Sequence, residues 1–136
     1  MSDTALVNYG PEPLSVELRE ISEPEIAPDE VLLEVEAVGV CGSDLHKYHS
    51  SREWAAERNG MISGHEPAGI IAEVGPNVDH LSVGDRVCVY HRTGCGHCMD
   101  CRSGYAAFCD DVRGAFGRTQ DGSHADYMLT DAKSVS

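Results

Sequence analysis

The sequence predicts a mainly β protein, a small barrel or sandwich that carries a cysteine-rich zinc lobe and a few short helices. Two observations support this fold class. Short apolar runs recur along the chain between turn residues, a pattern typical of antiparallel strands. Four cysteines gather between residues 95 and 109, where they can converge on one metal ion. With 136 residues, of which 41% are hydrophobic, the chain is predicted to form one domain, 1–136, with its own core.

Four strands are predicted from apolar and β-branched runs bounded by turn residues. They cover residues 31–38, 69–75, 85–90 and 126–130. Leu33, Val35 and Ala37 share one face of the first run. Glu34 and Glu36 lie on its other face, so this strand is predicted to be half exposed. Prolines are expected to keep the strands of the N-terminal region short, at positions 11, 13, 24 and 28.

Helices are predicted to be few and short. One is expected over 43–49, capped by Ser43 and with Asp44 in its first turn. A further turn or two is predicted over 51–58, because a serine and a glutamate at its start have the spacing of a capping box.

The four cysteines are the most specific signal in the chain. They read Cys95-Gly-His-Cys98-Met-Asp-Cys101, and Cys109 follows. Two Cys-x-x-Cys steps present three sulfurs to one point, and the chain returns with the fourth. The cluster is interpreted as the tetrahedral shell of a structural zinc, in a lobe over about 91–113. A pair of disulfides or a redox Cys-x-x-Cys is the alternative, but neither requires all four cysteines in one short lobe.

The chain is predicted to be cytoplasmic. Its first residues lack the basic and apolar regions of a signal peptide, and no run approaches the roughly 18 apolar residues of a membrane span. Thiols stay reduced in the cytosol, where cysteine clusters bind metals more often than they form disulfides, which argues against a small secreted domain held by disulfides. The net charge of -13 argues against nucleic acid or an anionic membrane as a partner.

A second group of metal-binding residue types lies upstream of the lobe. Cys41 is followed 24 residues later by His65 and then by Glu66. A lone cysteine is most often a small buried residue, and a lone histidine is most often a satisfied polar one. Together Cys41 and His65 supply two zinc ligands, or three if Glu66 joins. A catalytic zinc takes three protein ligands and leaves a fourth position open.

These residues lie in motifs that resemble the zinc-dependent alcohol dehydrogenases of the medium-chain dehydrogenase/reductase family. The matching segments are Val40-Cys41-Gly42-Ser43-Asp44-Leu45-His46, Gly64-His65-Glu66-Pro67-Ala68-Gly69, Val83-Gly84-Asp85-Arg86-Val87, the four-cysteine lobe and Gly122-Ser123-His124-Ala125-Asp126-Tyr127. They occur in the family's order, at close to its spacing, over nearly the whole chain. The resemblance implies a GroES-like β-barrel catalytic domain with the cysteine lobe as an excursion from it.

The resemblance also implies how the metals are held. Cys41 and His65 would bind a catalytic zinc, with Glu66 beside it as an alternate ligand or an outer group. A shell of two cysteines and a histidine holds the catalytic zinc of alcohol dehydrogenases, so the resemblance implies a further cysteine ligand beyond Cys41. Asp44 would accept a hydrogen bond from the far ring nitrogen of His65 and fix its tautomer. With the lobe, this makes two Zn²⁺ ions, one structural and one catalytic.

The family's chemistry explains the residues around the second zinc. Zinc acts as a Lewis acid that helps an alcohol lose its proton at neutral pH, and NAD or NADP then accepts a hydride. Ser43 would touch the substrate hydroxyl and begin a proton relay, because a hydroxyl both donates and accepts. His46 would pass the proton toward solvent, because an unperturbed imidazole titrates near pH ~6.5.

Other residues receive lesser roles. His91 falls where the family has the wall of its substrate pocket, so it is interpreted as favouring polar substrates over aliphatic ones. Trp54 is interpreted as packing over the same mouth or over the barrel. Cys88 is interpreted as a core residue and His124 as a structural residue in a loop. Three further histidines are interpreted as surface residues: His49, His80 and His97.

The family places its remaining catalytic zinc ligand and its nicotinamide-binding Rossmann domain downstream of this barrel. No Gly-x-Gly-x-x-Gly follows a strand in this sequence. We therefore expect the first part of a dehydrogenase, which binds one zinc firmly and is inactive by itself. The complete enzyme is expected to be a homo-oligomer that acts on a small alcohol or polyol. The alternative is a non-catalytic zinc-binding barrel that serves as an assembly or binding module, which would have no use for the relay residues.

Overall fold

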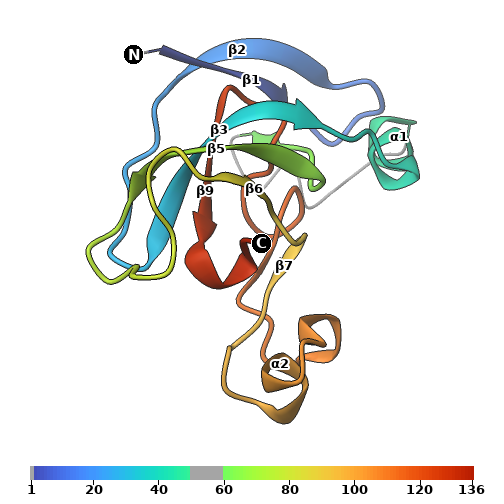
Figure 1. The fold of residues 1–136 in the computed structure, drawn as a ribbon. Helices are drawn as coiled ribbons and strands as arrows, with labels where there is room; N and C mark the ends of the chain where they lie inside the picture. The colour runs from blue at the N-terminus through green and yellow to red at the C-terminus, as the bar shows by residue number, and fades with distance from the viewer. Residues whose placement is uncertain (1, 50–59) are drawn as a thin grey trace.

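The structure is a computed structural model that describes residues 2–49 and 60–136, and it confirms the mainly β class (Figure 1). The strands in these residues are β1 (Ser2–Asn8), β2 (Val16–Ser22), β3 (Glu30–Val38), β4 (Met61–Ile62), β5 (Pro67–Val74), β6 (Arg86–Cys88), β7 (Arg92–Thr93), β8 (Gly114–Ala115) and β9 (Tyr127–Asp131). The helices are α1 (Gly42–His49), α2 (Met99–Arg102), and the 3₁₀ turns η2 (Ala106–Phe108) and η3 (Ala132–Ser134). None of the described helices combines the length and apolar character needed to cross a membrane.

The strands form two main antiparallel sheets and a short hairpin. The first sheet has the order β2-β1-β4, the second has the order β6-β5-β3-β9, and β7 pairs with β8. The segment before β9 joins the two main sheets, because Ala5 in β1 bridges Ala125 and the N–H of Leu6 donates to the carbonyl of His124 at 2.7 Å. This link brings β1 over the second sheet, as Figure 1 shows.

The hydrophobic core lies on the second sheet and is closed by the segment after the lobe. It consists of Val31, Leu33, Ile71, Val87, Val89, Phe116, Met128 and Ala132. The prediction of a half-exposed strand holds only for the second half of β3, where Glu34 and Glu36 are exposed. Val31, Leu32 and Leu33 are all buried, because the first half of β3 has cover on both faces.

Two sequence predictions for the barrel are wrong. Cys88 is exposed rather than in the core, because its neighbours Val87 and Val89 point inward and a strand alternates its faces. Strand β6 also ends at Cys88 instead of continuing to Tyr90, and Val89 makes only an isolated bridge to Val135. The strands β3, β5 and β9 confirm the other three predicted runs.

The helix α1 confirms the predicted short helix but begins one residue earlier. It starts at Gly42, so Ser43 lies inside the first turn and does not cap it. The capping contact comes instead from Asp44, whose Oδ2 accepts the N–H of Cys41 at 3.0 Å. This is the reach of a third helical residue back to the cap position. The predicted turn over 51–58, with Trp54, lies outside the described residues.

The cysteine lobe leaves the barrel through a narrow neck. Strands β7 and β8 pair there, with Arg92 opposite Ala115 and Thr93 opposite Gly114. Between them the chain forms α2 and η2, and this excursion projects away from the sheets (Figure 1). The neck makes the lobe a local unit that extends from the barrel, and Gly96 in the lobe also lies against the side chain of Lys133 in η3.

Candidate metal centres

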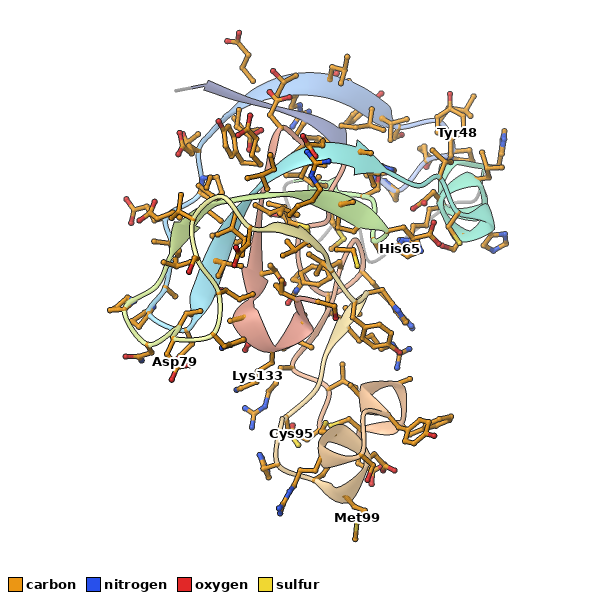
Figure 2. All side chains as sticks on the ribbon, in the orientation of Figure 1. Tyr48, His65, Asp79, Cys95, Met99 and Lys133 are labelled. Atoms are coloured by element: carbon orange, nitrogen blue, oxygen red, sulfur yellow. The ribbon has the colours of Figure 1, made fainter. Side chains whose placement is uncertain are left out.

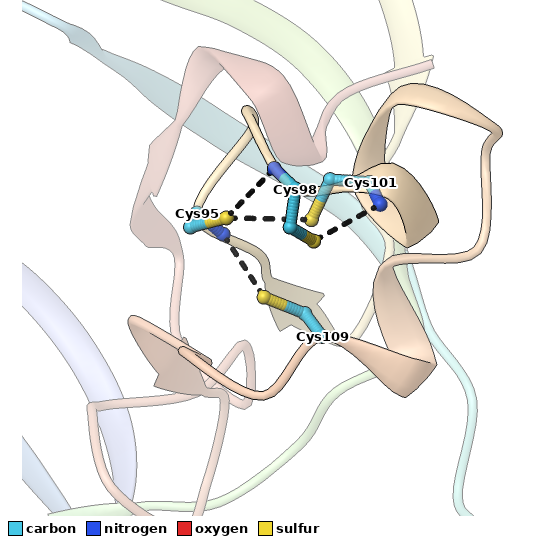
Figure 3. Close-up of side chains that lie close together, drawn as sticks. All are labelled: Cys95, Cys98, Cys101 and Cys109. Carbon is cyan, nitrogen blue, oxygen red and sulfur yellow. Dashed lines mark hydrogen bonds between the residues drawn. The ribbon is translucent and has the colours of Figure 1, made fainter.

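The four cysteines of the lobe converge on one point. The sulfurs of Cys95, Cys98, Cys101 and Cys109 all lie within 4.8 Å of one another (Figure 3). All four are free thiols, and the sulfurs of Cys95 and Cys101 are 4.0 Å apart. Sulfurs around a tetrahedral zinc are about 3.8 Å apart, whereas a disulfide requires about 2.05 Å. The spacing therefore fits a metal shell and argues against the alternative of two disulfides.

Backbone N–H groups of the lobe donate to these sulfurs. Cys98 N–H donates to the sulfur of Cys95 at 3.3 Å, and Cys101 N–H donates to the sulfur of Cys98 at 3.4 Å. The N–H of Cys95 donates to the sulfur of Cys109 at 3.4 Å. Because these donors favour thiolates, the loop is built to hold negative sulfurs around a cation.

The thiols of the cluster do not share one acidity. Hydrogen bonds from the backbone N–H groups of His97 and Cys98 lower the pKa of Cys95 to about 6. At Cys101 the N–H of Gly96 favours the thiolate, but burial and the neighbouring sulfurs outweigh it and raise the pKa to about 12. Thiols packed this closely lose their protons in turn, and each thiolate makes the next proton harder to remove. A divalent cation at the centre would relieve this repulsion.

Gly94, which belongs to none of the metal-binding residue types, shapes the lobe. A Cβ atom added to Gly94 would lie 2.5 Å from the sulfur of Cys101. No side chain fits at this position while the four sulfurs converge. The signal in the sequence is its place immediately before Cys95.

The second group forms where α1 meets β5. Ligand atoms of Cys41, His65 and Glu66 lie within 4.8 Å of one another. Cys41 directly precedes α1, and His65 and Glu66 directly precede β5. Figure 2 shows His65 next to α1 and well separated from Cys95 in the lobe. The donor set of a thiol, an imidazole and a carboxylate fits zinc, which accepts sulfur, nitrogen and oxygen ligands.

The side chains of Asp44 and Ser43 lie on either side of the His65 ring. Oδ1 of Asp44 lies 3.6 Å from Nδ1 of His65, and Oγ of Ser43 lies 3.4 Å from its Nε2. Both Oδ1 of Asp44 and Nδ1 of His65 are buried and have no hydrogen-bond partner among the described residues. A small closing movement would join these two orphaned atoms in the hydrogen bond that orients a ligating histidine. Nε2 then points to the side of Ser43.

Glycine again permits the close approach. A Cβ atom on Gly39 would lie 2.4 Å from Oε2 of Glu66, so glycine leaves room for this carboxylate where it lies. His46 is exposed on α1, one helical turn after Ser43. Ser43 is exposed as well, so both residues of the predicted relay lie on the open side of the metal-binding group.

A groove runs beside the second group. It has a volume of about 490 Å³ and is lined by His65, Glu66, Pro67, Ala68, Cys88, Val89, Tyr90 and His91. The ring centroids of His65 and His91 are 6.5 Å apart. Burial, together with the charges of Arg92 and His65, lowers the pKa of His91, so its imidazole is held neutral. Sequence reasoning found His91 but missed Cys88, because Cys88 was assigned to the core.

The remaining histidines agree with their predicted places. His49, His80 and His97 are exposed. His124 is partly buried, and its Nδ1 is 2.9 Å from Oγ of Ser63, which fits a structural role in its loop. Trp54 lies outside the described residues, so its predicted place at the groove is not described.

The β-barrel fold and the two groups of metal-binding residues together place the chain in a class of zinc-binding β-barrel domains. The chain belongs to the family of the alcohol dehydrogenase GroES-like domain, whose family model matches residues 27–136. It is 40% identical over 139 residues to the uncharacterized zinc-type alcohol dehydrogenase-like protein YphC of Escherichia coli, covering 97% of the chain and 39% of the relative. It is 42% identical over 133 residues to an alcohol dehydrogenase of Geobacillus stearothermophilus, covering 96% of the chain and 38% of the relative.

A solved structure agrees with these relatives. The cobalt- and zinc-bound thermostable alcohol dehydrogenase of Pyrobaculum aerophilum matches with a TM-score of 0.84 and 32% identity, covering 99% of the chain and 40% of that protein. The chain therefore spans 38% to 40% of the length of these three proteins. The relatives are zinc-type alcohol dehydrogenases, which confirms the family predicted from the motifs and the GroES-like barrel that it implies.

Proposed function

We propose that the chain is the catalytic-domain portion of a zinc-dependent oxidoreductase that oxidises a small alcohol or polyol, or reduces the carbonyl, with NAD or NADP. The observation that carries this proposal is the arrangement around His65. Cys41, His65 and Glu66 converge, Asp44 stands behind the imidazole, and Ser43 stands on its other side. A barrel that served only as a binding module would have no need for this combination.

In this proposal Cys41 and His65 hold a catalytic zinc, and Glu66 serves as an alternate ligand or an outer group. The bound zinc would supply Lewis acidity that lowers the pKa of the substrate hydroxyl, and the nicotinamide would accept the hydride. Asp44 orients His65 through the 3.6 Å approach of Oδ1 to Nδ1. Once the closing movement forms this hydrogen bond, it would keep the proton on Nδ1 and leave Nε2 free to bind the metal.

Ser43 and His46 carry the substrate proton in this proposal. Ser43 lies beside the imidazole of His65, at the edge where a substrate oxygen would meet the metal-binding group. Its hydroxyl can accept one proton while it donates another. His46 follows one turn later on the exposed side of α1 and can release the proton to water.

The groove beside His65 is the proposed substrate site, and His91 is its proposed selector. The neutral imidazole of His91 offers both a donor and an acceptor to a second hydroxyl of a polyol. In the enzyme completed by its cofactor domain, His91→Leu is expected to lower the polyol-to-aliphatic turnover ratio roughly 5- to 10-fold, the worth of one net hydrogen bond. An unchanged ratio of kcat/KM values would remove His91 from substrate selection.

The lobe is proposed to hold the structural zinc through Cys95, Cys98, Cys101 and Cys109. The two groups together imply two zinc ions. The lobe offers four thiolates and holds its ion firmly, whereas the group at Cys41 holds its ion more weakly because it offers fewer ligands. The isolated chain is expected to give no steady nicotinamide reduction with simple alcohols, because no Gly-x-Gly-x-x-Gly fingerprint for a nicotinamide cofactor follows a strand in this sequence.

Native mass spectrometry of the reduced chain tests the proposal. With added zinc, we expect a firmly bound ion and a second ion that chelators remove first. Cys41→Ser should lose only the second ion. Cys88→Ser is the matched control, because Cys88 is an exposed cysteine in the neighbouring groove, and it should keep both ions. A second ion that survives Cys41→Ser, or that is absent from the wild type at all zinc concentrations, would contradict the catalytic centre.

A further inference from the structure

Lys47 lies behind the second metal-binding group, just past the motif that ends at His46. It is on α1, six residues after Cys41, and its side chain is only 18% exposed. Its Nζ lies 4.0 Å from Oδ1 of Asp44 and donates to the carbonyl of Gly117 at 2.8 Å. Lysine is rarely buried to this extent without a paired charge, so the position calls for a physical reason.

The contact with Gly117 reaches the backbone that carries His65. Gly117 has φ 66°, and a Cβ atom on it would lie 3.2 Å from both Nζ of Lys47 and the backbone nitrogen of Gly64. Gly64 directly precedes His65. The turn at Gly117 is therefore packed between the ammonium of Lys47 and the residue before the proposed ligand, where any side chain would be both strained and tightly packed.

The same loop holds the chain before His65 through its backbone. The N–H of Gly122 donates to the carbonyl of Ile62 at 2.8 Å, and the N–H of Ser123 donates to the carbonyl of Gly64 at 3.1 Å. The loop thus pairs with the residues that lead into His65. Lys47 connects α1, which follows Cys41, to this loop, and the loop positions His65.

The ammonium of Lys47 also lies close to a buried negative charge, the carboxylate of Asp44. The carboxylate of Asp44 is 7% exposed and would be costly to bury without a compensating cation. Its Oδ2 is already used by the N–H of Cys41, so the approach of Oδ1 to His65 depends on what else faces Oδ1. Lys47 faces it on the same helix at the i, i+3 spacing. Removal of the ammonium would leave the carboxylate free to turn toward water and away from His65.

We infer that Lys47 is a positioning residue for the metal centre: it holds Asp44 against His65 and fixes the separation of Cys41 and His65 through the turn at Gly117. This inference rests on the proposed function, because it concerns the metal that Cys41 and His65 would bind. Lys47 touches neither metal nor substrate. It acts by reducing the rearrangement that metal binding would otherwise require.

A cobalt titration of the reduced 1–136 chain tests this inference. The lobe is first filled with one equivalent of zinc, and Co²⁺ is then added while the thiolate-to-cobalt absorption is recorded and a chelator competes. We expect Lys47→Met to weaken Co²⁺ binding at the Cys41 centre roughly 10-fold or more, the usual effect of losing an outer partner of a metal ligand. Lys47→Arg should recover most of the affinity, because it keeps the charge and a donor for Gly117.

Two further variants separate positioning from general stability. Lys133→Met is the matched control, because Lys133 is the other lysine of the chain and is exposed on η3. It should bind cobalt as the wild type does. Lys47→Gln keeps an N–H donor but loses the charge, and it serves if Lys47→Met does not fold. It should also weaken cobalt binding and change the absorption band, while the lobe retains its zinc.

The outcomes distinguish this inference from the proposed function. If the wild type shows no Cys41-dependent cobalt band, the catalytic centre itself fails and the role of Lys47 fails with it. If the wild type shows the band and the folded Lys47→Met or Lys47→Gln variant keeps its affinity and spectrum, the role of Lys47 is overturned while the centre stands. If Lys47→Arg binds cobalt as weakly as Lys47→Met, the role of Lys47 is also overturned, because the charge would then have no part in the effect.

Discussion

The two metal-binding groups are built in opposite ways. The lobe draws four ligands from one stretch of chain, 95–109, and hydrogen bonds within that stretch aim its sulfurs. The group at Cys41 draws its ligands from two elements, and contacts distant in sequence hold them together. A metal centre whose ligands are close in sequence, a local centre, can form wherever its loop folds. The metal affinity of a centre whose ligands come from separate elements, a divided centre, depends on the folded barrel that holds those elements together. We therefore expect the lobe to act as an autonomous metal site and the Cys41 group to depend on the barrel.

The largest effect is expected from breaking the local centre. Cys98→Ser removes one of four thiolates, and zinc bound by such shells contributes about 10–16 kcal/mol of apparent binding free energy. We expect the lobe to lose its ion and to become sensitive to proteases between β7 and β8, while far-ultraviolet circular dichroism shows the barrel sheets intact. An unchanged zinc content would show that the four sulfurs do not form the shell.

A core substitution should damage the divided centre and spare the lobe. Leu33→Ala removes a fully buried side chain from the centre of β3, and such changes cost about 2–5 kcal/mol. Urea unfolding should show this loss as a lower midpoint. At urea concentrations just below that midpoint, cobalt should leave the Cys41 centre before zinc leaves the lobe. Simultaneous loss of both ions would contradict the view that the lobe is autonomous.

A substitution at the contact behind His65 should affect only the divided centre. Asp44→Asn keeps the shape but removes the charge that faces Nδ1 of His65. We expect metal affinity at the Cys41 centre to fall 10- to 100-fold, which corresponds to about 1.4–2.7 kcal/mol, with no change in the zinc of the lobe. Asp79→Asn is a suitable control, because Asp79 is an exposed aspartate that also lies beside a histidine. If the wild type and Asp44→Asn bind metal at the Cys41 centre with equal affinity, the 3.6 Å approach of Asp44 to His65 has no role in metal binding.

The smallest effect is expected in the barrel body that joins the two regions. Asp3 is 1% exposed, and its Oδ1 accepts the N–H groups of Asp126 and Tyr127, which connects β1 to β9. Burial raises the pKa of Asp3 above its ordinary value of 3.8, although the N–H groups of Tyr127 and Asp126 oppose the shift. Between pH 3.8 and the raised pKa the folded state therefore keeps a proton that the unfolded state has lost, so this group's contribution to stability falls as the pH rises across that window.

Urea unfolding of the wild type and Asp3→Asn measures this contribution. The stability of the wild type relative to the variant should decline with rising pH in that window and should be constant above it. A difference that increases with pH would mean that the hydrogen bonds to Asp126 and Tyr127 outweigh burial. The result would show how firmly β1 closes over the sheet that positions His65.

The prediction from sequence succeeded where chemistry is local. The four-cysteine lobe follows from the spacing of its cysteines, and α1 follows from a polar start and a short run. The assignment of Cys88 to the core failed, because an apolar run does not reveal which of its alternating residues points inward. Strands β1 and β2 were not placed, because their apolar residues follow no regular period and Leu18 is 73% exposed.

The sequence by itself determined the family, the barrel class and the identity of the metal-binding residue types, because residue order and spacing record them directly. The resemblance of the motifs already implied that Asp44 faces His65. Only the tertiary structure decided that Lys47 joins α1 to the turn at Gly117 and that Gly39 lies against Glu66. The physical reason is distance along the chain. Local hydrogen bonding fixes a centre whose ligands are neighbours, but ligands from separate elements meet only after the sheets have packed and buried the charges between them.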